Sequence, residues 1–152
     1  MLPSAIGLLA LRIVVLVLVL STVPSSGGYG FGNDARRYEE ITAAAGRPYR
    51  DFQVEVPPVA LFAIGALGGA DAKALAVRLG IFMLLADVLI ALVLLRVWDR
   101  GAAFRYWVIG TPLCVFIYLR LDLLSVLLAI SAVAVYSTFD QVKGLFPGFG
   151  KP

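Results

Sequence analysis

The chain has 152 residues, enough for one domain, but its composition is not that of a soluble protein. Hydrophobic residues make up 61% of the sequence and charged residues 15%, whereas a soluble domain has about 25% charged residues. A chain of this size cannot bury so much apolar surface in its own core, so we expect membrane lipid to be part of its solvent. The net charge of +3 is small and scattered, and we expect no nucleic-acid partner.

Histidine is absent from the sequence, and Cys114 is its one cysteine. These two facts exclude Ser-His-Asp and Cys-His nucleophiles, histidine-ligated zinc and the usual histidine pH switch. They also exclude a disulfide within the chain. General acid–base catalysis would therefore depend on carboxylates, tyrosine or lysine.

The first predicted element is a membrane-spanning helix over residues 5–23, which has the ~20 apolar residues that a crossing needs. A cleavable signal peptide is the alternative. Against it, Arg12 lies inside the apolar run rather than before it, and Ser21-Thr22-Val23 is a poor cleavage site. A polar outer loop over 24–74 follows, and its first part holds half of the ten acidic residues of the chain.

Within this loop we predict a short helix over 35–45, with Asn33 or Asp34 as its N-cap and Gly46 at its end. One face of this helix is apolar and would suit a helix that lies on the membrane surface; it carries Tyr38, Ile41 and Ala45. Residues 58–70 form an apolar stretch that is too short for an ordinary crossing, so we interpret it as re-entrant or interfacial.

Three further spanning helices are predicted over 75–98, 104–119 and 122–139, before a Gly/Pro-rich tail over 140–152. The expected fold is all-α: a polytopic membrane protein with about four transmembrane helices, plus short interfacial helices in the first outer loop. The aromatic residues near the helix ends would be interface anchors; these are Trp98, Tyr106 and Trp107.

The orientation follows from the arginines of the short polar loop over 96–105. By the positive-inside rule, Arg96, Arg100 and Arg105 place this loop in the cytoplasm, provided that 58–70 does not cross. The N-terminus is then cytoplasmic, the 24–74 loop is outside, and the protein is a multi-pass protein of the cell (inner) membrane.

Charges inside the first two predicted spans give an expectation of their own. Arg12 and Asp87 would lie at depths that differ by only ~5 Å at ~1.5 Å per helical residue. Unpaired charges in a membrane are costly, so we expect these two side chains to pair between the helices. The alternative is that Arg12 reaches the interface and Asp87 faces a helix that this chain does not supply.

The most informative motifs lie in the two outer loops. Asp34-Ala35-Arg36-Arg37-Tyr38 places an acid one helical turn before a tyrosine, and it is followed by Gly46-Arg47-Pro48-Tyr49-Arg50-Asp51-Phe52-Gln53-Val54-Glu55-Val56-Pro57-Pro58. Arg120-Leu121-Asp122 precedes a Leu-rich helix. This order resembles the N-terminal part of C-type-fold membrane glycosyltransferases, above all glycosyltransferase family 87, the polyprenol-phosphate-mannose-dependent mannosyltransferases. Val56 departs from the tyrosine that is usual in that family.

The resemblance implies the transfer of a sugar, with mannose expected, from a polyprenyl-phosphate donor to a lipid or glycan acceptor in the cell envelope. It makes Asp34 the candidate catalytic base and Asp122 a second acid for contact with substrate or a divalent metal. The remaining candidates for substrate binding are Tyr38, Arg36, Arg37, Arg50, Asp51 and Glu55.

Structural alternatives stay open for several of these residues. Asp34 would serve equally as an N-cap. Asp51 and Glu55 would hold the loop through Arg47 or Arg50, and Arg120 with Asp122 would form a pair at a helix end that reaches water.

Enzymes of the resembling family have many more spanning helices. We therefore expect the chain to be part of a longer enzyme, or to need a partner chain that supplies further helices. The alternatives are a non-catalytic small membrane protein (a truncated product, subunit or scaffold) and, because of Arg12 and Asp87, a transporter fragment.

Overall fold

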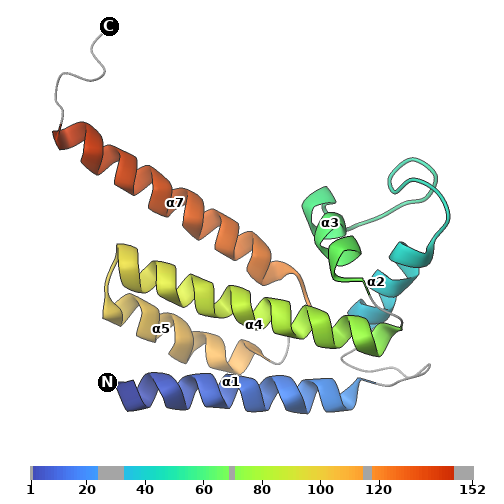
Figure 1. Ribbon diagram of the computed structural model, residues 1–152, viewed down its shortest axis with the longest axis horizontal. Helices are drawn as coiled ribbons and strands as arrows, with labels where there is room; N and C mark the ends of the chain where they lie inside the picture. Colours follow the sequence, from blue (N-terminus) through green and yellow to red (C-terminus); the bar gives the residue numbers. More distant parts are fainter. Residues whose placement is uncertain (1, 24–32, 69–70, 115–117, 146–152) are drawn as a thin grey trace, which may run out of the picture.

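The computed structural model describes residues 2–23, 33–68, 71–114 and 118–145 (Figure 1). Every regular element within these ranges is a helix, and the one β-type pairing found there is an isolated bridge between Pro48 and Phe52. The predicted all-α class is therefore confirmed for the described chain. Two helices are long and apolar enough to cross a membrane, over Ala5–Thr22 and Ala72–Val97.

Helix α4 (Ala72–Val97) is the centre of the molecule. Asp71 caps its N-terminus by accepting a hydrogen bond from the Ala74 amide at 2.7 Å. Five other helices contact it: α1 (Leu2–Thr22), α2 (Asn33–Ala43), α3 (Pro58–Leu67), α5 (Arg100–Gly110) and α7 (Asp122–Leu145). Helix α1 runs opposite to α4 in Figure 1, as neighbours in an antiparallel bundle do. Helix α7 runs in the same direction as α4 and diverges from it toward its C-terminal end.

The predicted helix over 104–119 is not a single α-helix. Helix α5 begins at Arg100, where Asp99 accepts a hydrogen bond from the Ala102 amide at 2.6 Å, and it ends at Gly110. A 3-10 turn, η1 (Thr111–Leu113), follows because Pro112 lacks an amide hydrogen and its ring conflicts with the preceding helical turn. Part of the predicted span, 115–117, lies outside the described residues.

The outer-loop region forms two short helices near the N-terminal half of α4 (Figure 1). Helix α2 begins at Asn33, so Asn33 and Asp34 lie within it and the predicted N-cap at either residue is wrong. Its apolar face packs on α4 through the buried Tyr38, and Ala45 lies exposed beyond the helix end, so the predicted contact of this face with a membrane surface is replaced by a contact with the core.

Helix α3 (Pro58–Leu67) has 10 residues, and the two prolines explain where it starts. Pro58 occupies the first helical turn, where its missing amide hydrogen costs nothing. The chain leaves α3 at Gly68, whose φ of +56° is a conformation that suits glycine. The predicted tail over 140–152 is helical as far as Leu145, and 146–152 lie outside the described residues.

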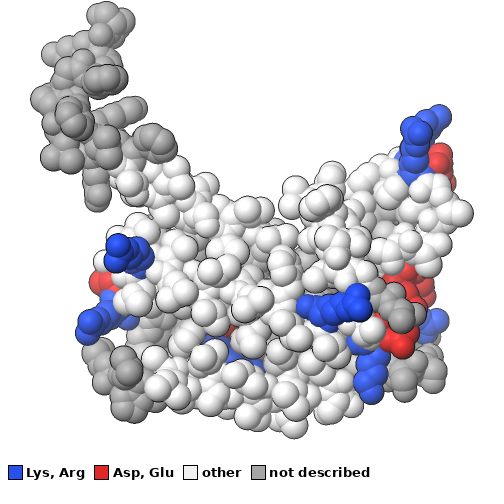
Figure 2. All heavy atoms as spheres, in the orientation of Figure 1, with Lys and Arg blue, Asp and Glu red and all other residues white. Residues whose placement is uncertain are grey.

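On the face shown in Figure 2, charged side chains gather at two ends of the molecule, and the band between them is white apart from a few blue and red atoms in its lower middle. Large hydrophobic side chains are exposed along this band on both membrane-length helices; examples are Val14, Val17, Leu18, Ile81, Leu85 and Leu89. Exposed apolar surface on this scale would be unfavourable in water.

Candidate functional site

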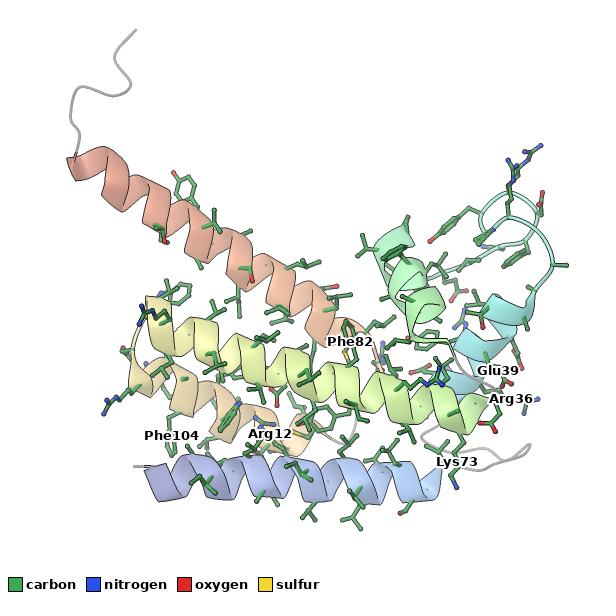
Figure 3. All side chains as sticks on the ribbon, in the orientation of Figure 1. Arg12, Arg36, Glu39, Lys73, Phe82 and Phe104 are labelled. Atoms are coloured by element: carbon green, nitrogen blue, oxygen red, sulfur yellow. The ribbon has the colours of Figure 1, made fainter. Side chains whose placement is uncertain are left out.

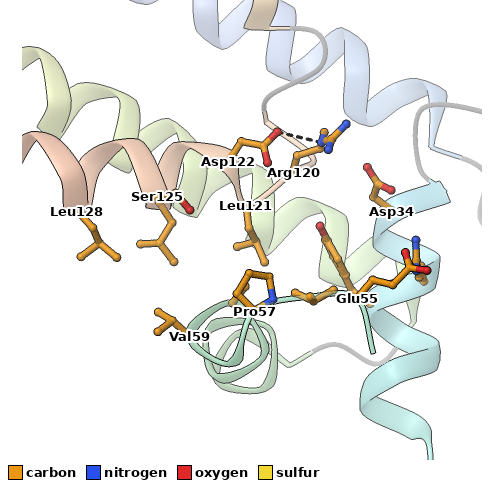
Figure 4. Close-up of a pocket in the computed structure, with 14 residues that line it drawn as sticks. Asp34, Glu55, Pro57, Val59, Arg120, Leu121, Asp122, Ser125 and Leu128 are labelled. Atoms are coloured by element: carbon orange, nitrogen blue, oxygen red, sulfur yellow. Dashed lines mark hydrogen bonds and ion pairs between the residues drawn. The ribbon is translucent and has the colours of Figure 1, made fainter. Parts of the chain in front are cut away.

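A cavity of about 550 Å³ lies where α2, the segment before α3, and the start of α7 meet (Figure 4). One end of the cavity is polar, and the other, toward Val59 and Leu128, is apolar. The polar lining consists of Asp34, Arg37, Tyr38, Glu55, Arg120, Asp122 and Ser125. The apolar lining consists of Val56, Pro57, Val59, Ala60, Leu121, Leu124 and Leu128. The cavity thus joins three segments that are far apart in sequence.

Helix α2 supplies Asp34 and Tyr38 to the cavity. These two residues are four positions apart, so their side chains lie on one face of the helix. Tyr38 is only 8% exposed and belongs to the main core cluster. Its packing fixes the rotation of α2 and thereby turns Asp34 toward the cavity. Burial, followed by the negative charge of Asp34, raises the pKa of the Tyr38 phenol, so this group stays protonated and can donate a hydrogen bond.

The segment before α3 supplies Glu55 after a tight turn. Gly46 has a φ of +118°, and the Asp51 carboxylate accepts a hydrogen bond from the Arg47 amide at 2.7 Å. The Tyr49 hydroxyl donates to the Val56 carbonyl. These contacts close the loop from within and leave Glu55 facing α2.

Two arginine–carboxylate pairs flank the cavity. The Arg37 Nη2 donates to Glu55 Oε2 at 2.6 Å, and the Arg120 Nε lies 3.0 Å from Asp122 Oδ2. The hydrogen bond to Glu55 raises the pKa of Arg37. Because all four side chains are at least half exposed, these pairs are weak and can open to bind an anion. Asp34 forms no ion pair with any described residue.

Five of the eight candidate residues from the sequence therefore line one cavity: Asp34, Arg37, Tyr38, Glu55 and Asp122. The other three do not line it. Arg36 pairs with Glu40 at 3.1 Å on the outer face of α2 (Figure 3). Arg50 and Asp51 lie in the exposed turn, where the Arg50 Nε is 3.9 Å from the Asp51 Oδ1.

The structural roles that the sequence allows for Asp51, Glu55 and Arg120 are confirmed for some of these residues and wrong for others. Asp51 does hold the turn, through the Arg47 amide. Glu55 pairs with Arg37, so its predicted contact with Arg47 or Arg50 is wrong. The predicted pair of Arg120 with Asp122 is confirmed.

Sequence reasoning left Arg120 and Ser125 out of the set of site residues. Arg120 belongs to the Arg120-Leu121-Asp122 motif, and its place before the first turn of α7 puts it at the same cavity. Ser125 follows Asp122 by three residues, and that helical spacing was the available signal. Among the described residues, no group of three or more Asp, Glu or Cys side chains is arranged to hold a metal ion.

A second polar cluster lies inside the helical bundle. Arg12 on α1 points toward α5 (Figure 3), and its Nε lies 3.2 Å from Asp87 Oδ2, with each side chain only 1% exposed. The predicted pairing is therefore confirmed. The contact is an ion pair without hydrogen-bond geometry at Nε.

Neighbouring helices complete the cluster. The hydroxyls of Tyr106 and Tyr118 donate to the Asp87 carboxylate at 2.7 and 3.1 Å. Arg12 donates to the Trp107 carbonyl at 2.9 Å and contacts the Cys114 sulfur. Tyr106 binds Asp87 through its hydroxyl, and the Arg12 Cζ lies 5.6 Å from the centroid of the Trp107 ring, so the predicted role of these two side chains as interface anchors is replaced by contacts within the bundle. Trp98 is exposed at a helix end.

Comparisons with protein families, with curated proteins and with solved structures found no match to this chain.

Proposed function

We propose that the chain is the outer-loop-bearing part of an integral-membrane glycosyltransferase of the family-87 kind, with about four spanning helices. It transfers a sugar, with mannose expected, from a polyprenyl-phosphate donor to a lipid or glycan acceptor outside the membrane. The observation that carries the proposal is the cavity that joins Asp34 to two arginines and an apolar lining. Such a lining suits a ligand with an anionic head and a long apolar chain.

The roles follow from the chemistry of an inverting transfer. The bond between the sugar carbon and the donor phosphate oxygen breaks while the acceptor oxygen forms a bond to the same carbon. Asp34, which is free of ion pairs among the described residues, takes the proton of the acceptor hydroxyl. Arg37 and Arg120 stabilise the departing polyprenyl phosphate after their carboxylate partners release them.

The apolar end of the cavity supports the same assignment. Val59 lies at the start of α3 and Leu128 on α7, and both line the end of the cavity that is farthest from Asp34 (Figure 4). A prenyl chain in this part would remove apolar side chains from water, which is favourable at roughly 25 cal/mol per Å². Tyr38, held protonated, can donate to a sugar or phosphate oxygen.

The test is to measure donor binding and transfer separately for Asp34→Asn. The chain is purified in lipid nanodiscs, and binding of polyprenyl-phosphate-mannose is measured by scintillation counting. Transfer is measured in membranes of cells that naturally make the protein, so that any partner chain is present. Because the base acts only in the transfer step, Asp34→Asn should bind the donor normally and lose transfer by about 10²-fold or more.

The matched control is Glu40→Gln, which removes a carboxylate from the same helix outside the cavity. It should leave both measurements unchanged. Normal transfer by Asp34→Asn would remove Asp34 from its proposed role. A chain that does not bind the donor at all would favour the non-catalytic alternative.

The buried charges do not favour a transport path. Arg12 and Asp87 are paired with each other and contacted by tyrosine hydroxyls and a backbone carbonyl. A buried pair that is enclosed by such contacts from the protein is more consistent with helix assembly than with binding of a transported ion.

A further inference from the structure

A second hollow lies at the opposite end of α4 from the candidate site. It has a volume of about 810 Å³ and follows the outer face of the last turns of α4 into the turn before α5. Its lining consists of Leu89, Leu92, Val93, Leu95, Arg96, Asp99 and Arg100. Helix α7 diverges from this end of α4 in Figure 1, and none of the α7 side chains that the structure describes (122–138) lines the hollow.

The lining has two chemically different parts. Four aliphatic side chains cover one part, and two arginines stand at the other. The carboxylate of Asp99 is engaged by the Ala102 amide as the cap of α5. Neither Arg96 nor Arg100 forms an ion pair with a described residue. The hollow therefore combines an aliphatic wall with a rim of net positive charge, made of two arginines and one carboxylate that is hydrogen-bonded to the start of α5.

We propose that this hollow binds an anionic phospholipid, with its phosphate between Arg96 and Arg100 and an acyl chain along Leu89, Leu92 and Val93. This inference rests on the membrane location in the proposed function, but not on glycosyl transfer. Arginine recognises phosphate through charge-assisted hydrogen bonds, and aliphatic helix surface is what acyl chains contact in a bilayer.

The dimensions agree with one lipid leaflet. Leu89 precedes Arg96 by seven residues, which is about 10 Å along a helix axis. The hydrocarbon half of a bilayer is about 15 Å deep, so the arginines reach the headgroup level while Leu89 lies among the acyl chains. Trp98, exposed between the two arginines in sequence, is the residue type that marks this level.

The charge of the rim also favours an anionic lipid over a second copy of the chain as the occupant of the hollow. A symmetric dimer through this face would bring the arginine rims of two copies together, and like charges oppose such an interface. An anionic headgroup instead neutralises them. Each arginine near an anionic lipid surface contributes on the order of 1 kcal/mol, which predicts about a tenfold or greater loss of affinity when both are removed.

The experiment is native mass spectrometry of the purified chain with equal amounts of phosphatidylglycerol and phosphatidylcholine. The intact chain should retain phosphatidylglycerol preferentially. Arg96→Gln with Arg100→Gln should lower its affinity about tenfold or more and leave phosphatidylcholine unchanged. The matched control, Arg47→Gln with Lys73→Gln, removes the same charge from other exposed positions and should keep the preference.

Equal affinities of the intact chain for the two lipids would overturn the inference. An equal loss of phosphatidylglycerol affinity in the control variant would also overturn it, as would a dimer of the intact chain that is absent in the arginine variant. If the Gln variant fails to fold, the unmodified chain is tested at 1 M salt instead. The salt should screen the arginine charges and abolish the preference for phosphatidylglycerol. A preference that persists at 1 M salt would argue against the inference. Binding of the sugar donor is measured in parallel. Loss of donor binding with intact lipid preference would contradict the proposed function alone.

Discussion

Arg12 and Asp87 are the buried charged residues in the described part of the chain, and they occupy its core as a pair. Their attraction must offset the desolvation of both groups. The tyrosine hydroxyls on Asp87 and the carbonyl of Trp107 on Arg12 reduce that cost by hydrogen bonding. Removal of one partner leaves the other charge buried without compensation, which costs about 3–5 kcal/mol.

We therefore expect Arg12→Met and Asp87→Leu, made singly, to lower the yield of folded protein and its melting temperature. The double variant should recover most of the loss, because a buried pair that is replaced by apolar side chains is often close to neutral in stability. Yield and thermal unfolding in detergent are the measurements. A double variant as unstable as either single one would contradict the coupling.

The charge-swapped variant, Arg12→Asp with Asp87→Arg, distinguishes the pair from its surroundings. An aspartate at position 12 would face the Trp107 carbonyl, and two acceptors would then oppose each other. The swap should therefore recover less than the apolar double variant. Recovery by the swap to the full original stability would show that the carbonyl has no influence.

At this scale the sequence predicts the pair but not its partners. Arg12 and Asp87 could be matched because depth along a helix depends only on position in the chain. Tyr106 and Tyr118 could not be assigned to Asp87, since their approach depends on where α5 ends and how the chain turns after it. Arg37 was likewise expected at the site, whereas its pairing with Glu55 depends on the fold of the intervening loop.

The packing of α1 on α4 depends on a glycine. A Cβ atom at Gly80 would lie 2.7 Å from the Leu16 Cδ1 and 3.7 Å from the Leu20 Cδ2, so the two helices approach closely at this point. Small residues allow such contacts between helices in membranes. The same contact brings Arg12, one turn from Leu16, within reach of Asp87.

We expect Gly80→Ile to displace α1, whereas Gly80→Ala should be tolerated because only the end of a flexible leucine side chain must move. Cys114 is buried and contacts Arg12, so its rate of maleimide labelling reports on the displacement. Gly80→Ile should raise that rate about tenfold or more. Gly7→Ile is the control, since nothing lies within 4 Å of a Cβ at Gly7. Equal labelling in both isoleucine variants would refute the proposed close contact.

Among the elements, the long helices could be predicted and their interruptions could not. Residues 5–23 and 75–98 are recognisable because continuous apolar runs of that length have few alternatives. The predicted helix over 104–119 was wrong in extent because hydropathy ignores the effect of Pro112 on the backbone. The amphipathic pattern of α2 was visible, but a pattern alone does not distinguish a membrane surface from α4 as the surface that its apolar face covers.

For the whole molecule, the candidate site arises from contacts that no local pattern encodes. The motifs at 34–38, 46–58 and 120–122 are separate in sequence, and their resemblance to one family was the only reason to group them. The structure gathers Asp34, Glu55 and Asp122 at one cavity because Tyr38 anchors α2 on α4 and α7 starts beside it. Arg36 and Arg50 resemble the others in sequence, but the fold turns them outward.

The antiparallel arrangement of α1 and α4 makes a prediction about orientation. The connection between these helices must begin and end at the same end of the bundle, where α2 and α3 also lie (Figure 1). The turn around Arg100 lies at the other end. If both helices span the membrane, the arginines at 96, 100 and 105 place that turn in the cytoplasm and the candidate cavity outside.

Reporter insertions test this orientation. Alkaline phosphatase inserted after Arg100 should be inactive and green fluorescent protein at the same place should fluoresce, because phosphatase folds only outside the inner membrane of bacteria. Insertion after Ala44, in the exposed turn beyond α2, should give the opposite pair of results and serves as the control. Active phosphatase after Arg100 would place the arginine turn outside. It would then exclude the candidate cavity from the outer surface, where a lipid-linked sugar donor is expected to meet its acceptor.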